Sequence, residues 1–241
     1  MNAKKIVAAL ALLAGLAPAA ARAQSSIVSQ IAGDEAATEK LHFSLNFGLN
    51  CATLAGAGAE RLGGPSVGLA ATVRLNGRLS LVPEVTLLSR KGVTAIPFFT
   101  TGDPELDPYF ADPAKSALVL DYVDVPVQIR YRLGRFNVGG GPFVAFLSKA
   151  TERFRAEPET GGELLYAADV TGEFRKTDYG LVLEASWTIT RPRRGAGLIF
   201  HVRWQAGLPD LLRDTGSHLH VLSPTLRNRV LQIYLSFPFV R

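Results

Sequence analysis

Residues 41–50 read LHFSLNFGLN, in which apolar residues at odd positions alternate with polar or small residues at even positions. Successive side chains of a β-strand point to opposite faces, so this stretch predicts a strand with one apolar and one polar face. The pattern recurs in seven further stretches, at residues 66–75, 78–87, 122–132, 136–146, 178–189, 198–205 and 231–239. The sequence therefore predicts eight strands, and no stretch after residue 40 is uniformly apolar enough to predict a transmembrane helix.

The connections between these strands are expected to alternate in length. Three are short, at Asn76-Gly77, Gly134-Arg135 and residues 191–195, and Asn-Gly favours a two-residue hairpin turn with positive φ. Four are long and polar, at residues 51–63, 91–117, 150–177 and 209–227. Short turns at one end and long loops at the other are typical of bacterial outer-membrane barrels. An even number of strands places both termini on the periplasmic side, with the long loops facing outward.

The apolar faces suit lipid, because a closed barrel pairs every backbone N–H and C=O within the protein. Aromatic residues gather on these faces, many near strand ends, where interfacial girdles are expected. They are Phe43, Phe47, Phe136, Tyr179, Trp187, Phe200, Trp204, Phe237 and Phe239. We therefore expect an all-β protein, an eight-stranded antiparallel up-and-down transmembrane β-barrel in the bacterial outer membrane.

The polar faces would then line the interior. Eight strands enclose just enough space for side chains, so we expect the charged residues there to pair with one another in a structural network rather than line a pore. The predicted network comprises Arg74, Arg78, Glu84, Asp124, Arg130, Arg132, Glu184, His201 and Arg203.

The N-terminal residues have the pattern of a secretory signal peptide. Lys4 and Lys5 precede an apolar run at residues 6–16, and Ala21-Arg22-Ala23 forms an A-x-A cleavage site. The predicted organisation is a signal peptide at residues 1–23, a periplasmic lead-in at residues 24–40 and the barrel domain at residues 41–241. The whole chain has 26 basic and 21 acidic residues, and without Lys4, Lys5 and Arg22 the balance is 23 to 21. This near-neutral charge argues against a nucleic-acid partner.

Two stretches resemble the PorT-like outer-membrane β-barrel family. Residues 81–92, LVPEVTLLSRKG, are similar to its PEL…S.KG strand, and residues 122–131, YVDVPVQIRY, are similar to its YLEIPLLLKY strand. Weaker resemblance covers most of residues 41–241. It implies an outer-membrane barrel and makes Pro83 and Pro126 family positions. The chain departs at its end, since Val240 and Arg241 follow Phe239, whereas such proteins usually finish on an aromatic residue read by the assembly machinery.

Four prolines conflict with regular strands, because proline lacks the N–H that a ladder needs. Pro83, Pro126, Pro142 and Pro238 all lie inside predicted strands, and we interpret them as bulges or strand ends. Cys51 is the only cysteine, so no internal disulfide is expected, and it is interpreted as an ordinary apolar residue at a strand end.

Metal and catalytic sites have weak support. Candidate ligands are His218 with His220, and Asp103 with Glu105 and Asp107. The histidine pair has no further ligands, and Pro104 and Pro108 interrupt the acidic set, so we expect neither a metal nor another cofactor. His42, Ser44 and His201 could meet inside the barrel, but no nucleophile–base spacing is visible, and we expect no enzyme.

Three classes of function remain open. We favour a structural or interaction protein, a monomer whose loops contact an unknown extracellular or periplasmic partner or ligand. The alternatives are a narrow channel for small solutes and a lipid-modifying membrane enzyme. Outer-membrane lipid and the barrel-assembly machinery are expected as partners in all three cases.

Overall fold

The computed structural model describes residues 41–97, 102–110, 112, 115–156, 162–190, 195–213, 219, 222–223 and 225–240. The predicted signal peptide at residues 1–23 and lead-in at residues 24–40 lie outside the described residues. The predicted turn at residues 191–195 lies outside them as far as residue 194.

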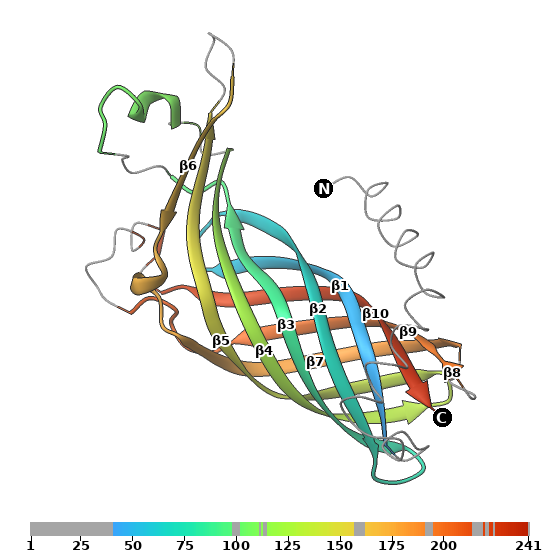
Figure 1. Cartoon of the computed structure of the whole chain (residues 1–241). Helices are drawn as coiled ribbons and strands as arrows, with labels where there is room; N and C mark the ends of the chain where they lie inside the picture. Colours follow the sequence, from blue (N-terminus) through green and yellow to red (C-terminus); the bar gives the residue numbers. More distant parts are fainter. Residues whose placement is uncertain are drawn as a thin grey trace.

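Eight antiparallel strands close into a barrel (Figure 1). In order around the barrel they are β1 (Leu41–Ala55), β2 (Glu60–Arg74), β3 (Leu79–Thr94), β4 (Ser116–Leu133), β5 (Phe136–Ala156), β7 (Thr177–Thr190), β9 (Leu198–Gly207) and β10 (Arg227–Val240). β10 pairs back onto β1, with Phe237 opposite Leu45, which closes the sheet. The short β8 (Gly195–Ala196) pairs with the end of β10 beside β9. All eight predicted strands are present, and the predicted fold class is confirmed.

Several strands continue past the predicted boundaries at the long-loop end. The predicted loop at residues 51–63 is wrong, because β1 and β2 run on to a short turn at residues 56–59. β5 leaves β7 at Phe146 and pairs instead with β6 (Leu164–Asp169). We call residues 116–121 of β4, residues 148–156 of β5 and β6 the extension, and Figure 1 shows it projecting past the other strands. Two short 3-10 helices, η1 (Asp107–Phe110) and η3 (Thr171–Glu173), lie in its connections.

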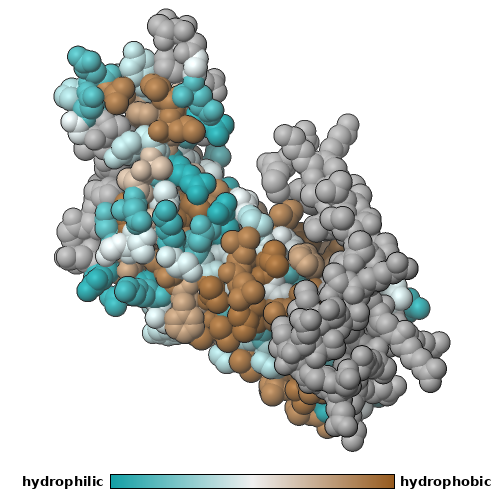
Figure 2. All heavy atoms as spheres, viewed as in Figure 1, coloured by the Kyte–Doolittle hydropathy of each residue, from teal (hydrophilic) through white to brown (hydrophobic). Residues whose placement is uncertain are grey.

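The two faces of the strands differ as alternation predicts. In β1 every even residue from His42 to Leu54 is buried and every odd residue is half-buried. Figure 2 shows a hydrophobic band across the barrel wall, with hydrophilic residues gathered at the long-loop end. Large apolar side chains exposed on the wall include Leu69, Val85, Leu87, Val127, Ile129, Val138, Phe146, Tyr179, Leu181, Leu183, Trp187, Trp204 and Leu231. In the described part of the chain, no helix is both long and apolar enough to span a bilayer.

The two described turns at the opposite end differ from each other. Leu133 pairs with Phe136, and Gly134 between them has φ of 70°, as a tight hairpin requires. The predicted positive φ at the Asn76-Gly77 turn is wrong. There Leu75 and Asn76 donate to the Leu79 carbonyl, and the Asn76 side chain accepts from the backbone N–H groups of Arg78 and Leu79 at 2.8 Å each. The asparagine side chain organises this turn instead of glycine.

The strand prolines do not mark bulges. Pairing keeps one register on both sides of Pro83, Pro126 and Pro142, so the bulge interpretation is wrong for these three. The actual shifts fall nearby, between Thr86 and Ser89 on β3 and at Asp121 on β4. Pro238 lies two residues from the end of β10, as the strand-end interpretation predicts.

Candidate functional site

A buried ion-pair network occupies the middle of the barrel. Arg203 of β9 donates to Glu84 of β3 through Nη1 at 3.0 Å and Nη2 at 2.6 Å. Its Nε and Nη2 also donate to Oε2 of Glu184 on β7, at 2.9 and 2.7 Å. The guanidinium is further held by the Gln232 side-chain oxygen at 3.2 Å and the Tyr234 hydroxyl at 2.6 Å. Each of the three guanidinium nitrogens of Arg203 thus donates to at least one acceptor in the interior.

Glu184 is the second centre of this network. Its Oε1 accepts from Arg130 at 2.7 Å and lies 3.0 Å from Nδ1 of His201. Its Oε2 accepts from the Tyr234 hydroxyl as well as from Arg203. The His201 ring stacks on Tyr234 with ring centres 4.3 Å apart. Two arginines therefore balance two carboxylates, as a buried cluster requires.

A second polar cluster lies nearer the long-loop end. Lys91 of β3, which is fully buried, contacts Oδ1 of Asp124 at 2.8 Å, and Ser89 donates to Oδ2 of Asp124 at 2.8 Å. The Lys91 ammonium also lies 4.6 Å from the centre of the Tyr122 ring. Asn228 of β10 donates to the buried Asp178 of β7 at 2.8 Å. The Asn228–Asp178 hydrogen bond joins two strands that are not neighbours in the sheet, so it crosses part of the interior.

Above this cluster the interior becomes apolar. Residues of β1, β3, β4 and β5 pack with residues from the long connections: Leu54, Val93, Leu118, Phe154, Ile96, Phe110, Val170, Phe174, Leu211, Leu212, Leu219 and Leu226. Backbone hydrogen bonds fix the connections over the barrel, from Arg175 to Leu211 at 2.7 Å and from Leu211 to Leu226 at 2.8 Å. We call this set the apolar plug. The long connections, predicted to be solvated loops, supply a hydrophobic core.

Most of the predicted charge network is found in the interior. Glu84, Asp124, Glu184, His201 and Arg203 are buried, and Arg130 and Arg74 are half-buried. The prediction is wrong for Arg78 and Arg132, which are exposed at the short-turn rim, where Arg78 donates to the Tyr131 hydroxyl and Arg132 to the Gly77 carbonyl. At the rim the polar face of a strand meets water instead of the interior.

Lys91, Tyr234 and Asp178 are network residues that the sequence prediction left out. Lys91 was assigned to a loop, and strict alternation from Glu84 would point it outward. The bulge between Thr86 and Ser89 reverses that alternation. The adjacent outward pair Leu87-Leu88 is the one sequence signal of this reversal, because two consecutive lipid-facing residues require an extra residue in the strand.

The other candidate sites gain little support. His218 and His220 lie outside the described residues, and no cluster of three metal-ligating side chains occurs within the described ones. The Asp103 carboxylate accepts the Glu105 backbone N–H at 2.9 Å within a turn. Among described residues, the hydrogen-bond partner of His201 is Glu184 and not Ser44. Cys51 lies within β1, four residues from its end.

Comparisons with known proteins identify a family. A family model for the outer membrane protein beta-barrel domain matches residues 23–213. No curated protein matches the sequence. Among solved structures, Ail, the attachment invasion locus protein of Yersinia pestis, is 8% identical with a TM-score of 0.40, covering 82% of this chain and 98% of that one. Neisserial surface protein A is 9% identical with a TM-score of 0.37, covering 82% and 96%. Outer membrane protein AlkL is 10% identical with a TM-score of 0.41, covering 86% and 94%.

Proposed function

Because this chain belongs to the outer membrane protein beta-barrel domain family and is a bacterial outer-membrane barrel, we propose that it is a closed, non-conducting protein that acts through its long-loop end. In this proposal the long-loop end faces the outside of the cell and presents the extension to a partner or ligand. The barrel is a monomer in contact with outer-membrane lipid, and the barrel-assembly machinery inserts it.

The filling of the interior is the observation that supports closure. The Arg203–Glu84–Glu184 network lies across the middle of the barrel, and the apolar plug lies above it. A conducting path would have to cross both layers. Desolvating an ion in the apolar plug, which offers no replacement ligands, would cost several kcal/mol or more.

A narrow water path is the second candidate, and one observation favours it. Several buried polar atoms have no protein partner, including both amide atoms of Gln128 and Nε2 of His201. Such atoms are usually satisfied by ordered water. This water would lie on the short-turn side of the apolar plug. A continuous path between the two ends of the barrel would therefore also require the plug to open.

Conductance in planar bilayers tests the proposal. We expect the wild-type protein to give no discrete conductance steps, while insertion is confirmed by its resistance to added protease. Steps in the wild-type protein that scale with salt concentration would overturn closure. A variant that opens the apolar plug, Leu211→Asp with Phe174→Asp, serves as the comparison, since it places charge within the buried cluster.

Two further predictions, that the protein is not an enzyme and that it belongs to the PorT-like subgroup, remain proposals. The protein is not an enzyme in this proposal, because His201 is buried and engaged with Glu184 rather than open to a substrate. Membership of the PorT-like subgroup rests on the two motif stretches. They form neighbouring strands, with Leu81 opposite Ile129 and Pro83 opposite Val127, so the two motifs would constrain a single ladder.

A further inference from the structure

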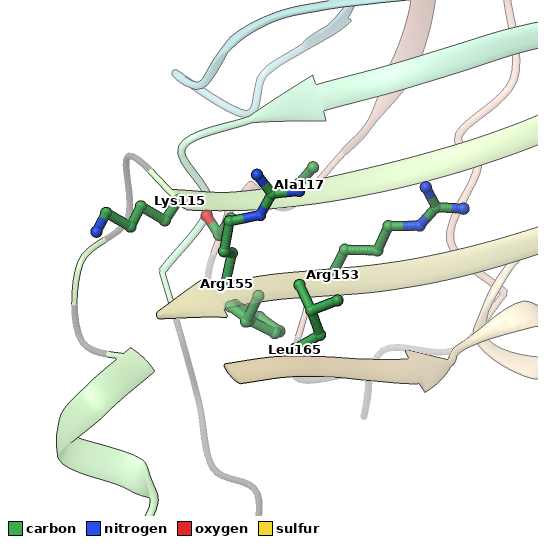
Figure 3. A pocket seen from close by; sticks show the side chains of 7 residues that line it. Lys115, Ala117, Arg153, Arg155 and Leu165 are labelled. Atoms are coloured by element: carbon green, nitrogen blue, oxygen red, sulfur yellow. The ribbon is translucent and has the colours of Figure 1, made fainter. Parts of the chain in front are cut away.

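A pocket lies on the outer face of the extension, where β4, β5 and β6 run side by side (Figure 3). Its volume is about 460 Å³, within the range typical of small-molecule sites. The described residues that line it are Lys115, Ser116, Ala117, Arg153, Phe154, Arg155 and Leu165. The pocket is thus separate from the barrel interior and open to the outside of the protein.

The pocket is strongly cationic. Its described lining includes three basic side chains, Lys115, Arg153 and Arg155, and no carboxylate. Figure 3 shows Arg153 and Arg155 rising from the same face of β5, with Lys115 near the start of β4. Arginine forks match the oxygens of a phosphate group bidentately.

One carboxylate lies next to the pocket without lining it. Glu163 accepts from Nε of Arg155 at 2.7 Å, and both side chains are about half exposed, at 59% and 46%. An exposed pair of this kind contributes little stability. A phosphate could therefore replace Glu163 at low cost or share Arg155 with it.

The pocket also has apolar walls. Arg155 lies opposite Leu165 in the β5–β6 ladder, and the Leu165 side chain is 68% exposed. Phe154 also borders the pocket but is only 3% exposed and packs into the apolar plug, so Leu165 provides the exposed apolar surface. Apolar surface beside cations suits the faces of a sugar ring that carries phosphate, better than it suits an isolated inorganic ion.

The pocket lies beyond the lipid-facing part of β5. On β5 the last large lipid-facing side chain is Phe146, and the first cation above it is Lys149, opposite Asp121. Asp121 also pairs with Arg90 at 2.8 Å, which forms a charged row across three strands. Arg153 lies four residues beyond Lys149, or roughly 13 Å along the strand. The pocket therefore lies above the hydrocarbon, beyond the charged row.

We propose that this pocket binds a phosphorylated saccharide, through salt bridges from Arg153, Arg155 and Lys115 and contact of the sugar with Leu165. The inference rests on the proposed function, because it names a ligand class for the extension. The phosphosugar could be the headgroup of a glycolipid in the outer leaflet or a soluble molecule, since the chemistry of recognition is the same.

Binding measurements on the full-length protein test the proposal. The first probe is lipid A, added to the protein in a phosphorus-free detergent and read out by the phosphorus that co-purifies with the protein. The second is soluble glucose 1,6-bisphosphate, read out by calorimetry on the protein in phosphatidylcholine nanodiscs. The test variant is Arg153→Gln with Arg155→Gln. The matched control is Arg61→Gln with Arg227→Gln, which removes the same charge at the long-loop end, on β2 and β10, outside the pocket.

We expect the test variant to weaken binding of at least one probe about tenfold or more, and the control to stay within about twofold of the wild type. Loss with lipid A alone would assign the ligand to the membrane, and loss with the soluble probe alone would assign it to solution. No binding by the wild type, or equal loss in the control, would overturn the proposal. Folding of each variant is checked by gel mobility with and without boiling. Conductance is independent of this result, so a failure here leaves the test of closure intact.

Discussion

Arg203 and Glu84 join opposite walls of the barrel. Arg203 lies on β9 and Glu84 on β3, and three strands separate them in either direction around the closed sheet. Two parallel hydrogen bonds of 3.0 and 2.6 Å connect the guanidinium and the carboxylate. The side chains therefore span the interior, and Arg203 is only 1% exposed. Such a bidentate cross-barrel pair fixes the distance between the two walls.

Removing one member of this network should destabilise the barrel. Glu184→Gln would leave Arg203 paired with Glu84 and would remove the ion pair of Arg130 with Glu184. Breaking one side of a buried ion pair typically costs about 3–5 kcal/mol. We expect a loss of this size in urea unfolding of the protein in lipid vesicles, followed by tryptophan fluorescence.

The double variant Arg203→Met with Glu84→Gln provides the test of mechanism. It removes one positive and one negative charge together, so it should be less destabilised than Arg203→Met alone. Arg132→Gln at the exposed rim is the control and should cost about 1 kcal/mol or less. If the double variant lost the full sum of the two single losses, the two side chains would act independently.

Alternation predicted the strands well where the interior is polar. Around Asn46 and Glu184 polar and apolar residues alternate, and the strands there are found as expected. It failed where the interior turns apolar. Ala52 and Leu54 face inward into the apolar plug, so both faces of β1 are apolar there and the alternation disappears from the sequence. The same change conceals the end of β5 at Phe154 and Ala156.

The site prediction failed for reasons of geometry. Alternation identifies a face but not a height, so it could not separate Arg132 at the rim from Arg130, two residues away on the same face. Bulges also leave little trace in the sequence. The bulge between Thr86 and Ser89 points Lys91, which was predicted to lie in a loop, into the interior. The cationic pocket depends on β6 pairing with β5, and nothing in local periodicity predicts that pairing.

Replacing two exposed leucines by arginine should change the stability of the protein by very different amounts. Leu183 of β7 is 58% exposed on the barrel wall, and Leu165 of β6 is exposed on the extension. Leu183→Arg places a cation against hydrocarbon and should cost about 2–4 kcal/mol near the bilayer midplane. Leu165→Arg places it in water and should change stability by about 0.5 kcal/mol or less. Unfolding from vesicles measures both.

The pair also locates the membrane boundary. An inward-facing residue of the same strand, such as Ser186, would be a poor control for Leu183. Ser186 is buried and accepts a hydrogen bond from Asn137 at 3.1 Å, so replacing it would also break that bond. Equal losses for the two leucine variants would contradict the placement of the extension outside the hydrocarbon.

The apolar plug should hold the long connections in place. Phe174 is buried against the plug and bridges to Leu212. Phe174→Ala would leave a cavity, with a local cost of about 3–5 kcal/mol. We expect faster cleavage of the long connections by added protease, while the barrel still shows the change in gel mobility on boiling that marks a folded barrel. Tyr109→Ala, which removes a half-exposed ring, should leave the cleavage rate unchanged. Equal rates in the two variants would show that the plug does not restrain the connections.

Two turn glycines provide a matched pair, because an added Cβ would meet no atom within 4 Å at either Gly77 or Gly134. They differ in backbone conformation, since Gly134 has φ of 70° and Gly77 lies outside the positive-φ region. Gly134→Ala should therefore cost about 1 kcal/mol through strain. Gly77→Ala should be neutral or stabilise by up to about 1 kcal/mol, because alanine restricts the unfolded chain. Urea midpoints at equal slope measure the difference, and a loss at Gly77 as large as at Gly134 would mean that Asn76-Gly77 adopts the two-residue, positive-φ turn after all.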